Sequence, residues 1–395
     1  MQPRDLSALT PYEAGRGTEE VAREVGMDPD DLVKLSSNEN PHGPSPRAVE
    51  AMHEHADGVH HYPKAAHADL QAALAEQRDL APEQVWLANG GDGALDYLAR
   101  AMLEPGDRVL VPHPGFAYYA MSVRYHHGRV ETYPLRREED FEQRPANVLD
   151  AYDGQRIVYL ISPHSPTGRE VDREAILEVA DGVDDDTVVL VDEAYGAFSE
   201  APSKVDLVRE RDDVAVLRTF SKSHGLAGVR LGYLLAPEAW GDAYARINTP
   251  FAVNELALRA GLAALEDEEH VEQSVESATW AREFIHENLA AETWPSQGNF
   301  VLAAVGDAGE VFEAAKERGV IVRDATSFGL PGCIRITCGT RAETTRAVEV
   351  LNEVLAMRDP YEGTGAPGSF PATSSGTPGG GFGGDAPDPD GTGGE

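Results

Sequence analysis

The chain has 395 residues, of which 33 are basic and 68 acidic, so its formal net charge at pH 7 is −35. Such an acidic surface repels nucleic acids and anionic membranes, which excludes both as expected partners. The acids are spread along the whole chain, which is typical of halophilic proteins and predicts a salt requirement for folding. The length predicts one large domain plus a smaller one, because single cores rarely grow beyond about 250–300 residues.

Other features bear on the cellular compartment. No apolar run approaches the roughly 20 residues of a membrane-spanning helix, and the first residues lack the apolar stretch of a secretory signal. Cys333 and Cys338 lie five residues apart on an expected strand and its exit, so we expect them to face opposite ways. Both are therefore expected to be reduced core residues of a cytoplasmic protein.

Residues 1–45 are rich in proline and turn-forming residues around one expected helix at 18–25. Asn38 opens the run N-E-N-P-H-G-P-S-P, where three prolines within six residues impose an extended path. A helix with apolar residues at i, i+3 and i+4 is expected after Tyr62-Pro63. Five histidines lie between 53 and 67, but they form no ligand set of fixed spacing with cysteine or carboxylate, so we expect them at the surface rather than on a metal.

Strands and helices alternate from residue 85 to 236. The pattern predicts strands at 85–88, 108–111, 156–161, 187–192, 214–217 and 231–236, with helices at 94–103 and 172–183. This alternation, with Val- and Leu-rich strands, predicts an α/β fold with a mostly parallel, doubly wound sheet. Functional groups of such sheets gather where the strands end.

Two of these strand ends carry residues that suit a charged ligand. The glycine turn at 89–93, which includes Gly91 and Asp92, presents free backbone amides before a helix, and such amides bind anions. Many α/β loops look the same, so this signal is weak by itself. Asp192 ends a continuous apolar strand, and a buried carboxylate there needs a cationic partner unless it is only a helix cap.

The stretch T-F-S-K-S-H-G-L-A-G-V-R-L-G-Y follows the strand at 214–217. It places Lys222 among hydroxyl residues, and a neutral lysine amine attacks a carbonyl to form a Schiff base. Thr219, Ser221 and Arg230 are donors that suit a phosphate. A solvated lysine on a surface loop is the ordinary alternative. Only five lysines stand against 28 arginines, which favours a specific role.

The remaining chain predicts a compact α+β unit. Helices are expected at 237–246 and across 254–289, followed by strand 300–305, helix 311–318, strands 320–323 and 334–337, and a helix ending at 357. Arg323 and Arg335 lie in apolar strands, where either a bound anion or a structural ion pair compensates their charge. Residues 359–395 hold Gly, Pro, Ser, Thr and acids but no basic residue, which predicts a disordered tail without a catalytic role.

Several motifs resemble one family. The run S-K-x-x-x-L-A-G-x-R-x-G-Y is similar to the lysine signature of the pyridoxal-phosphate-dependent fold-type I aminotransferases, especially the histidinol-phosphate aminotransferase branch. The runs N-E-N-P-x-G-P-S, D-E-A-Y and R-I-T-x-G-T-R match the same branch, and the resemblance covers about residues 6–356. It implies a large cofactor-binding domain at 46–269, a small domain at 270–357 joined by residues 1–45, and a separate tail at 358–395.

The resemblance also implies roles for single residues. Lys222 would bind pyridoxal 5'-phosphate, Asp192 its ring nitrogen and Tyr195 its phenolic oxygen. Further cofactor contacts would come from Gly91, Asp92, Thr219, Ser221, Arg230, Tyr119 over the ring, and Tyr62 from the second subunit of a homodimer. Substrate contacts would come from Arg335 to the substrate carboxylate, from Arg323 to the substrate phosphate, from Asn38, and from Tyr12 of the partner subunit. Ser165 stands where the family's N-P-T-G motif has the asparagine that bonds the phenolic oxygen.

The implied reaction is transamination of L-histidinol phosphate with 2-oxoglutarate, a step of histidine biosynthesis. An aromatic amino acid aminotransferase or a threonine-phosphate decarboxylase would share every cofactor residue. The opening and closing motifs disfavour the decarboxylase. The alternative of another class is a non-catalytic cofactor-binding module, and Ser165 is its only support.

Overall fold

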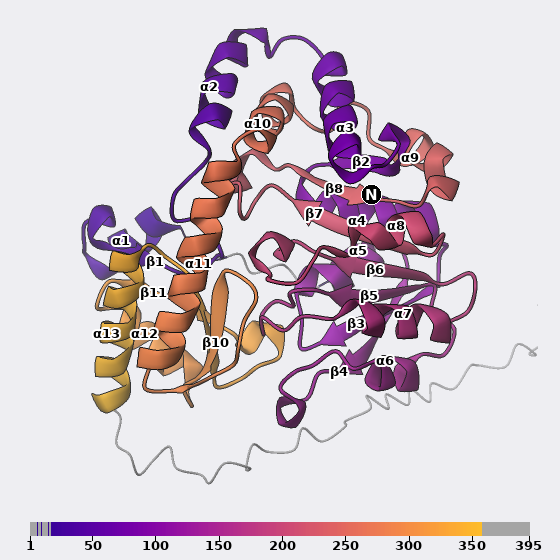
Figure 1. Cartoon of the computed structure of the whole chain (residues 1–395). Coiled ribbons are helices and arrows are strands. Elements are labelled where there is room, and N and C mark those ends of the chain that lie inside the picture. Colours follow the sequence, from indigo (N-terminus) through magenta and orange to yellow (C-terminus); the bar gives the residue numbers. More distant parts are fainter. Residues whose placement is uncertain (1–5, 7–8, 10–14, 16, 358–395) are drawn as a thin grey trace, which may run out of the picture. The chain divides into compact units, whose positions relative to one another are not determined.

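The computed structural model describes residues 6, 9, 15 and 17–357 (Figure 1). Tyr12 and the predicted tail lie outside the described residues. Among the helices within the described part, none is both long and apolar enough to cross a membrane.

The largest sheet in the described part of the chain has seven strands in the order β2-β8-β7-β6-β5-β3-β4 (Figure 1). Its strands are β2 Val85–Ala88, β3 Arg108–His113, β4 Arg129–Pro134, β5 Ile157–Ile161, β6 Val188–Asp192, β7 Val214–Thr219 and β8 Gly232–Leu235. The pairs from β7 through β4 are parallel, whereas β8 runs antiparallel to both β7 and β2. The predicted mostly parallel α/β sheet is confirmed.

Helices cover both faces of this sheet, which explains its apolar strands. Ile157 and Tyr159 of β5 join one apolar cluster, whereas Val158 and Leu160 join another on the opposite face. The first cluster includes side chains of α4 Gly90–Met102, α5 Ala117–Tyr125 and α9 Gly241–Ile247. The second includes side chains of α2 Pro46–His55, α3 Lys64–Arg78, α6 Pro145–Ala151, α7 Arg173–Gly182, α8 Leu207–Glu210 and α10 Glu255–Leu265.

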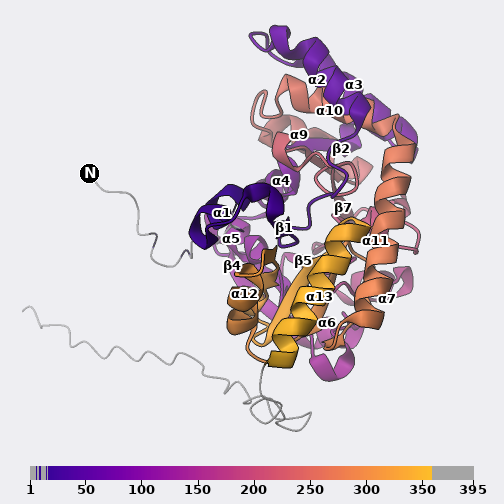
Figure 2. The ribbon, with the colours of Figure 1, turned by 90° about the vertical axis from the view of Figure 1, so that its left-hand side faces the viewer.

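Two smaller sheets follow at the C-terminal side of the chain. Antiparallel strands β12 Arg323–Asp324, β13 Cys333–Thr337, β10 Phe300–Ala304 and β9 Glu292–Thr293 form one of them. In the other, β1 Val33–Lys34 pairs in parallel with β11 Val320–Ile321, so the N-terminal segment joins this part of the fold. The accompanying helices are α1 Thr18–Val25, α11 Glu268–Asn288, α12 Ala308–Lys316 and α13 Arg341–Met357. Figure 2 shows α11 and α13 side by side.

The structure corrects two predicted elements. The single strand expected at 320–323 is two strands in different sheets, because Val320–Ile321 pairs with β1 and Arg323–Asp324 pairs with β13. The helix expected from residue 94 begins at Gly90, so the glycine turn is its first turn. Cys333 and Cys338 are free, buried and in different apolar clusters, as predicted. The proposed domain boundary at 269/270 falls in the first turn of α11, and the division itself stays a prediction.

Candidate active site

Asp192 ends β6 at the edge where the parallel strands finish. It is 5% exposed, and its two carboxylate oxygens accept hydrogen bonds from Tyr119 Oη and the Ala194 amide, each at 2.8 Å. Burial raises the pKa of Asp192 to about 6 even though both donors lower it. Within residues 17–357 it has no ion-pair partner at 4 Å or less. The site therefore favours a cation in front of this carboxylate.

Lys222 and Tyr195, both predicted site residues, lie together, and Tyr195 follows Asp192 by three residues. Lys222 Nζ lies 5.5 Å from the centroid of the Tyr195 ring and 3.5 Å from the Ser37 carbonyl oxygen. Tyr195 Oη accepts a hydrogen bond of 2.9 Å from the side-chain amide of Asn38. Burial alone would raise the pKa of Tyr195, but the charges of Lys222 and Arg335, with hydrogen bonds from Asn38 and Ser165, bring it below its usual value.

Tyr119 has a role that the sequence did not predict. Its hydroxyl donates to Asp192 and its ring stacks on Tyr159 at 5.3 Å between centroids, whereas its expected place over the cofactor ring stays a prediction. Burial and the neighbouring carboxylate raise its pKa well above the usual value, so the hydroxyl stays protonated as a donor. Tyr119 therefore orients the Asp192 carboxylate.

The predicted phosphate donors meet at the N-terminus of α4. Arg230 Nη2 lies 3.1 Å from Asp92 Oδ2, and a Cβ on Gly90 would lie 2.4 Å from the same guanidinium nitrogen. Gly90 has a φ of +78°, so both its backbone and this close approach require glycine. Gly91 follows in the first turn, where helix amides have no internal partner. The hydroxyls of Thr219 and Ser221 lie 3.0 Å apart, and Thr219 pairs with Gly232, where a Cβ would lie 2.6 Å from the Gly90 carbonyl carbon. Amides, hydroxyls and an arginine form a donor set that suits a phosphate.

The two predicted substrate arginines face each other across a strand pair. Arg323 is the register partner of Arg335 in the β12–β13 ladder, and both guanidiniums lie over Phe328, at 5.4 and 5.1 Å from its centroid. Arg335 Nη1 donates to Ser165 Oγ at 3.1 Å and Nη2 to the Ser36 carbonyl at 3.0 Å. Like charges in directly opposed positions are unfavourable, and an anionic ligand would relieve their repulsion.

A segment at residues 36–40, which we call the strap, contacts Arg335, Lys222 and Tyr195. Its carbonyl oxygens accept from Arg335 at Ser36 and from Lys222 at Ser37. Asn38 lies between Tyr195 and Thr337, whose hydroxyl is 3.1 Å from Asn38 Oδ1 and 3.0 Å from its backbone nitrogen. The sequence predicted only Asn38 from this segment. The run N-E-N-P includes Asn40 but not Ser36 or Ser37.

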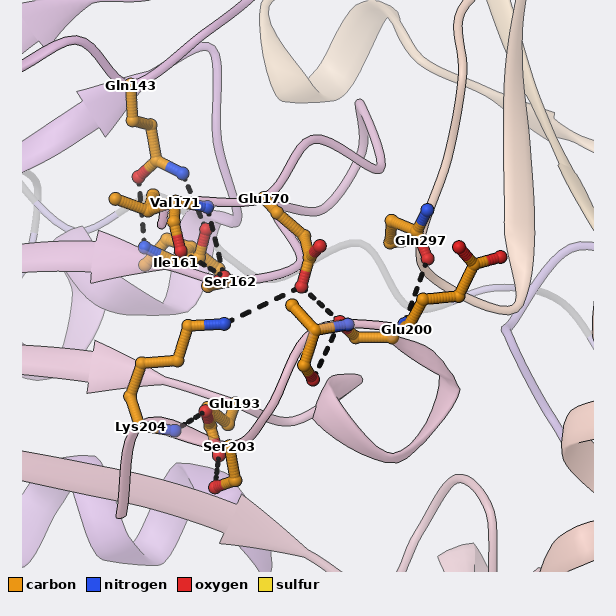
Figure 3. Close-up of polar contacts among 12 residues, drawn as sticks. Gln143, Ile161, Ser162, Glu170, Val171, Glu193, Glu200, Ser203, Lys204 and Gln297 are labelled. Atoms are coloured by element: carbon orange, nitrogen blue, oxygen red, sulfur yellow. Dashed lines mark hydrogen bonds and ion pairs between the residues drawn. The ribbon is translucent and has the colours of Figure 1, made fainter. Parts of the chain in front are cut away.

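Buried charges behind the site hold two of its loops together (Figure 3). Lys204, which is 5% exposed, places Nζ 3.7 Å from Glu170 Oε1, and its backbone nitrogen donates to Glu193 Oε1 at 2.6 Å. Glu193 follows Asp192 and also accepts from Ser203 Oγ at 2.6 Å. Glu170 lies on the loop after Ser165, so Lys204 connects the Ser165 loop with the Tyr195 loop. Sequence reasoning missed Lys204 and Glu193.

Tyr62 lies apart from the residues described above. Its side chain is 72% exposed, and its ring stacks on Phe251 with 4.4 Å between centroids. The two rings border a groove of about 460 Å³ that Val59, Pro63 and Leu256 also line. The predicted contact of Tyr62 with a second subunit stays a prediction.

Known proteins share the sequence and the fold of this chain. The family model described as aminotransferase class I and II matches residues 30–351. A histidinol-phosphate aminotransferase from Natronomonas pharaonis is 67% identical over 355 residues, which cover 90% of this chain and 100% of the relative. One from Haloarcula marismortui is 65% identical over 355 residues, with coverages of 90% and 99%. The crystal structure of histidinol-phosphate aminotransferase from Sinorhizobium meliloti in complex with pyridoxal-5'-phosphate has a TM-score of 0.78 and 26% identity, and covers 89% of this chain and 99% of that one. The chain belongs to the family of class I and II aminotransferases.

Proposed function

We propose that the chain transfers the amino group of L-histidinol phosphate to 2-oxoglutarate, with pyridoxal 5'-phosphate as cofactor and Lys222 as its covalent anchor. The observation that carries the proposal is the placement of Lys222 over Tyr195, which lies on the segment that follows the buried Asp192. The names of the relatives at 65–67% identity favour this substrate over those of the aromatic aminotransferases and the threonine-phosphate decarboxylases.

The residues present fit the cofactor. Asp192 is a buried carboxylate without an ion-pair partner among residues 17–357, which suits a protonated ring nitrogen. The acidified phenol of Tyr195 suits the phenolic oxygen, and the amides of α4 with Arg230 suit the phosphate. A non-catalytic module would not need an amine such as that of Lys222 next to Tyr195. The residues at this site therefore support a transaminase.

Each side chain has a separate task in the reaction. Bound pyridoxal phosphate supplies an electron sink for charge that develops at the substrate Cα. Lys222 Nζ would accept the proton from that carbon and deliver it to the cofactor carbon bonded to the transferred nitrogen, which is general acid–base work. Asp192 keeps its negative charge opposite the ring nitrogen, and Tyr119 holds its orientation. Arg335 holds the anionic end of the substrate through a forked guanidinium.

The paired arginines allow a specific prediction about substrates. Replacing Arg335 by glutamine should lower kcat/KM for both substrates by about 100-fold, because a charged hydrogen bond is worth about 1.5–3 kcal/mol. Replacing Arg323 should lower kcat/KM for L-histidinol phosphate more than for 2-oxoglutarate, because a phosphate dianion attracts the second guanidinium more strongly. Single-turnover kinetics of the two half-reactions measure this.

Arg318→Gln is the control for the arginine variants, since Arg318 donates to the Ala314 carbonyl at 2.7 Å at the end of α12. Its kinetics should match the wild type. If Arg323→Gln left the half-reaction with L-histidinol phosphate unchanged, the assignment of Arg323 to the phosphate would be wrong.

Ser165 carries a second prediction. Its hydroxyl accepts from Arg335 and lies within reach of Tyr195, but it is shorter than the asparagine of the family motif. Ser165→Asn should therefore lower the pH midpoint of the visible absorbance of the reconstituted protein by about one unit and raise turnover several-fold. Ser165→Ala should shift both in the opposite direction. Unchanged absorbance and turnover in Ser165→Asn would refute this role.

We further propose a cytoplasmic homodimer in which Tyr62, and Tyr12 from outside the described residues, reach the partner subunit's site. The exposed Tyr62–Phe251 pair and the adjacent apolar groove support a protein partner at this surface. The two buried, free cysteines fit a reducing compartment.

A further inference from the structure

Asn40 of the strap bonds the backbone of the catalytic-lysine loop. Its side-chain nitrogen lies 3.3 Å from the Lys222 carbonyl oxygen, 2.9 Å from the Ser223 carbonyl oxygen and 2.8 Å from Ser274 Oγ. Its side-chain oxygen accepts from the His42 amide at 2.9 Å, which fixes which end of the amide faces the carbonyls. Asn40 therefore directs its donor at two consecutive peptide groups, the first of which belongs to Lys222.

The chain just after the strap contacts the lysine loop at a second point. Gly225 has a φ of +69°, and a Cβ there would lie 1.9 Å from the Gly43 carbonyl oxygen. The Gly225 amide in turn donates to the Lys222 carbonyl at 3.1 Å. The loop after Lys222 is thus pressed against the chain that follows Asn40, with no room for a side chain between them.

The other end of Lys222 touches the same segment. Its Nζ lies 3.5 Å from the Ser37 carbonyl, three residues before Asn40. Both the backbone and the amine of this residue are therefore held by residues 37–40. During the reaction the Lys222 amine must leave the Ser37 carbonyl and return to it. A fixed Lys222 backbone limits the positions that the amine can reach.

We propose that Asn40 is a positioning residue for Lys222, which keeps the Lys222–Ser223 backbone in place while the amine moves. This inference rests on the proposed function, in which Lys222 Nζ reacts. Asn40 touches neither substrate nor cofactor in this role and acts through Lys222 alone. A displacement of about 1 Å of a reacting group can cost about 100-fold in rate, so loss of this anchor should be felt in kcat.

The test compares Asn40→Ala and Asn40→Asp with Ser274→Ala. Asn40→Ala removes the donor, and Asn40→Asp places a carboxylate oxygen against two carbonyls while keeping the bond from His42. Ser274→Ala removes the third partner of the same amide and leaves the lysine loop untouched. We expect kcat to fall about 10-fold in Asn40→Ala and about 100-fold in Asn40→Asp, with KM within about twofold. Ser274→Ala should stay within about twofold of the wild type.

A second readout does not depend on turnover. Cofactor-free protein is mixed with pyridoxal phosphate, and the rate of covalent capture by Lys222 is followed by absorbance and located by borohydride reduction and peptide mass spectrometry. Capture should slow about 10-fold in Asn40→Ala, and thermal unfolding verifies that each variant is folded. Asn40→Ala keeps the test decisive if Asn40→Asp does not fold.

Two results would overturn the inference. Equal losses of kcat in Ser274→Ala and Asn40→Ala would mean that Asn40 only anchors the strap to α11. Normal cofactor capture and normal kcat in Asn40→Ala would mean that Asn40 does not position Lys222. A wild-type protein that captures no cofactor at Lys222 would instead contradict the proposed function itself.

Discussion

Replacing Lys222 by arginine is expected to reduce transamination by at least about 1,000-fold without unfolding the protein. Arginine stays protonated at any working pH, so it neither forms the covalent link nor accepts the substrate proton. Its positive charge still faces Tyr195, and Lys222 has no ion-pair partner within residues 17–357 that the exchange would disturb. The change therefore isolates the amine chemistry from the electrostatics of the site.

The matched control for this variant is Lys316→Arg. Lys316 is also buried, at 3% exposed, but its Nζ contacts Glu24 at 2.7 Å and Glu313 at 2.5 Å. Turnover of the reconstituted control should stay within about threefold of the wild type, since an arginine satisfies the same carboxylates. More than about 1% residual activity in Lys222→Arg would contradict the role of Lys222 as acid–base group.

Asp192→Asn is expected to change stability and activity in opposite directions. The carboxyl of Asp192 has its pKa raised by burial from the usual 3.8 to about 6, which corresponds to about 3 kcal/mol. Its ionisation therefore destabilises the folded, cofactor-free protein at neutral pH. The neutral amide should raise the free energy of unfolding by up to about 3 kcal/mol, yet lower kcat of the reconstituted enzyme by at least about 100-fold because the charge opposite the ring nitrogen is lost.

The raised pKa of Asp192 also determines how the stability difference between the two proteins changes with pH. The folded protein keeps the Asp192 proton until about pH 6, whereas the unfolded chain releases it near its usual pKa of 3.8. The stability of the wild type should thus fall, relative to Asp192→Asn, as pH rises from about 4 to 6, and the difference should persist above pH 6. Denaturant unfolding of both proteins across this range measures it. Parallel stability curves, or a variant that keeps wild-type turnover, would contradict the assignment.

The principal site residues could be predicted because they follow strand ends. Asp192 ends an apolar strand, and Lys222 follows the next one, so parallel pairing of β6 and β7 brings both to one edge. The small number of lysines pointed to Lys222, but it does not single this residue out. Lys204 and Lys316 are equally scarce and are more buried than Lys222. What distinguishes Lys222 is its position after a strand end without a carboxylate within 4 Å among residues 17–357, and the sequence shows only its position.

The contacts of the strap could not be predicted because they join distant parts of the chain. Ser37 meets Lys222 across 185 positions, and Ser36 meets Arg335 across 299. No local pattern specifies such pairs, and proline-enforced extension shows only that residues 36–40 are not helical. For the same reason the change of sheet at Val322 was missed, since a continuous apolar run does not reveal which neighbour each half will pair with.

The central claim is that Lys222 and its neighbours carry an amino group from L-histidinol phosphate. The most direct measurement is the absorbance spectrum of protein reconstituted with pyridoxal phosphate in high salt, before and after that donor is added. We predict loss of the visible absorbance of the lysine-bound cofactor, growth of the near-ultraviolet absorbance of the aminated cofactor, and reversal by 2-oxoglutarate. A spectrum that ignores L-histidinol phosphate but responds to phenylalanine, or to threonine phosphate with release of CO₂, would contradict the claim.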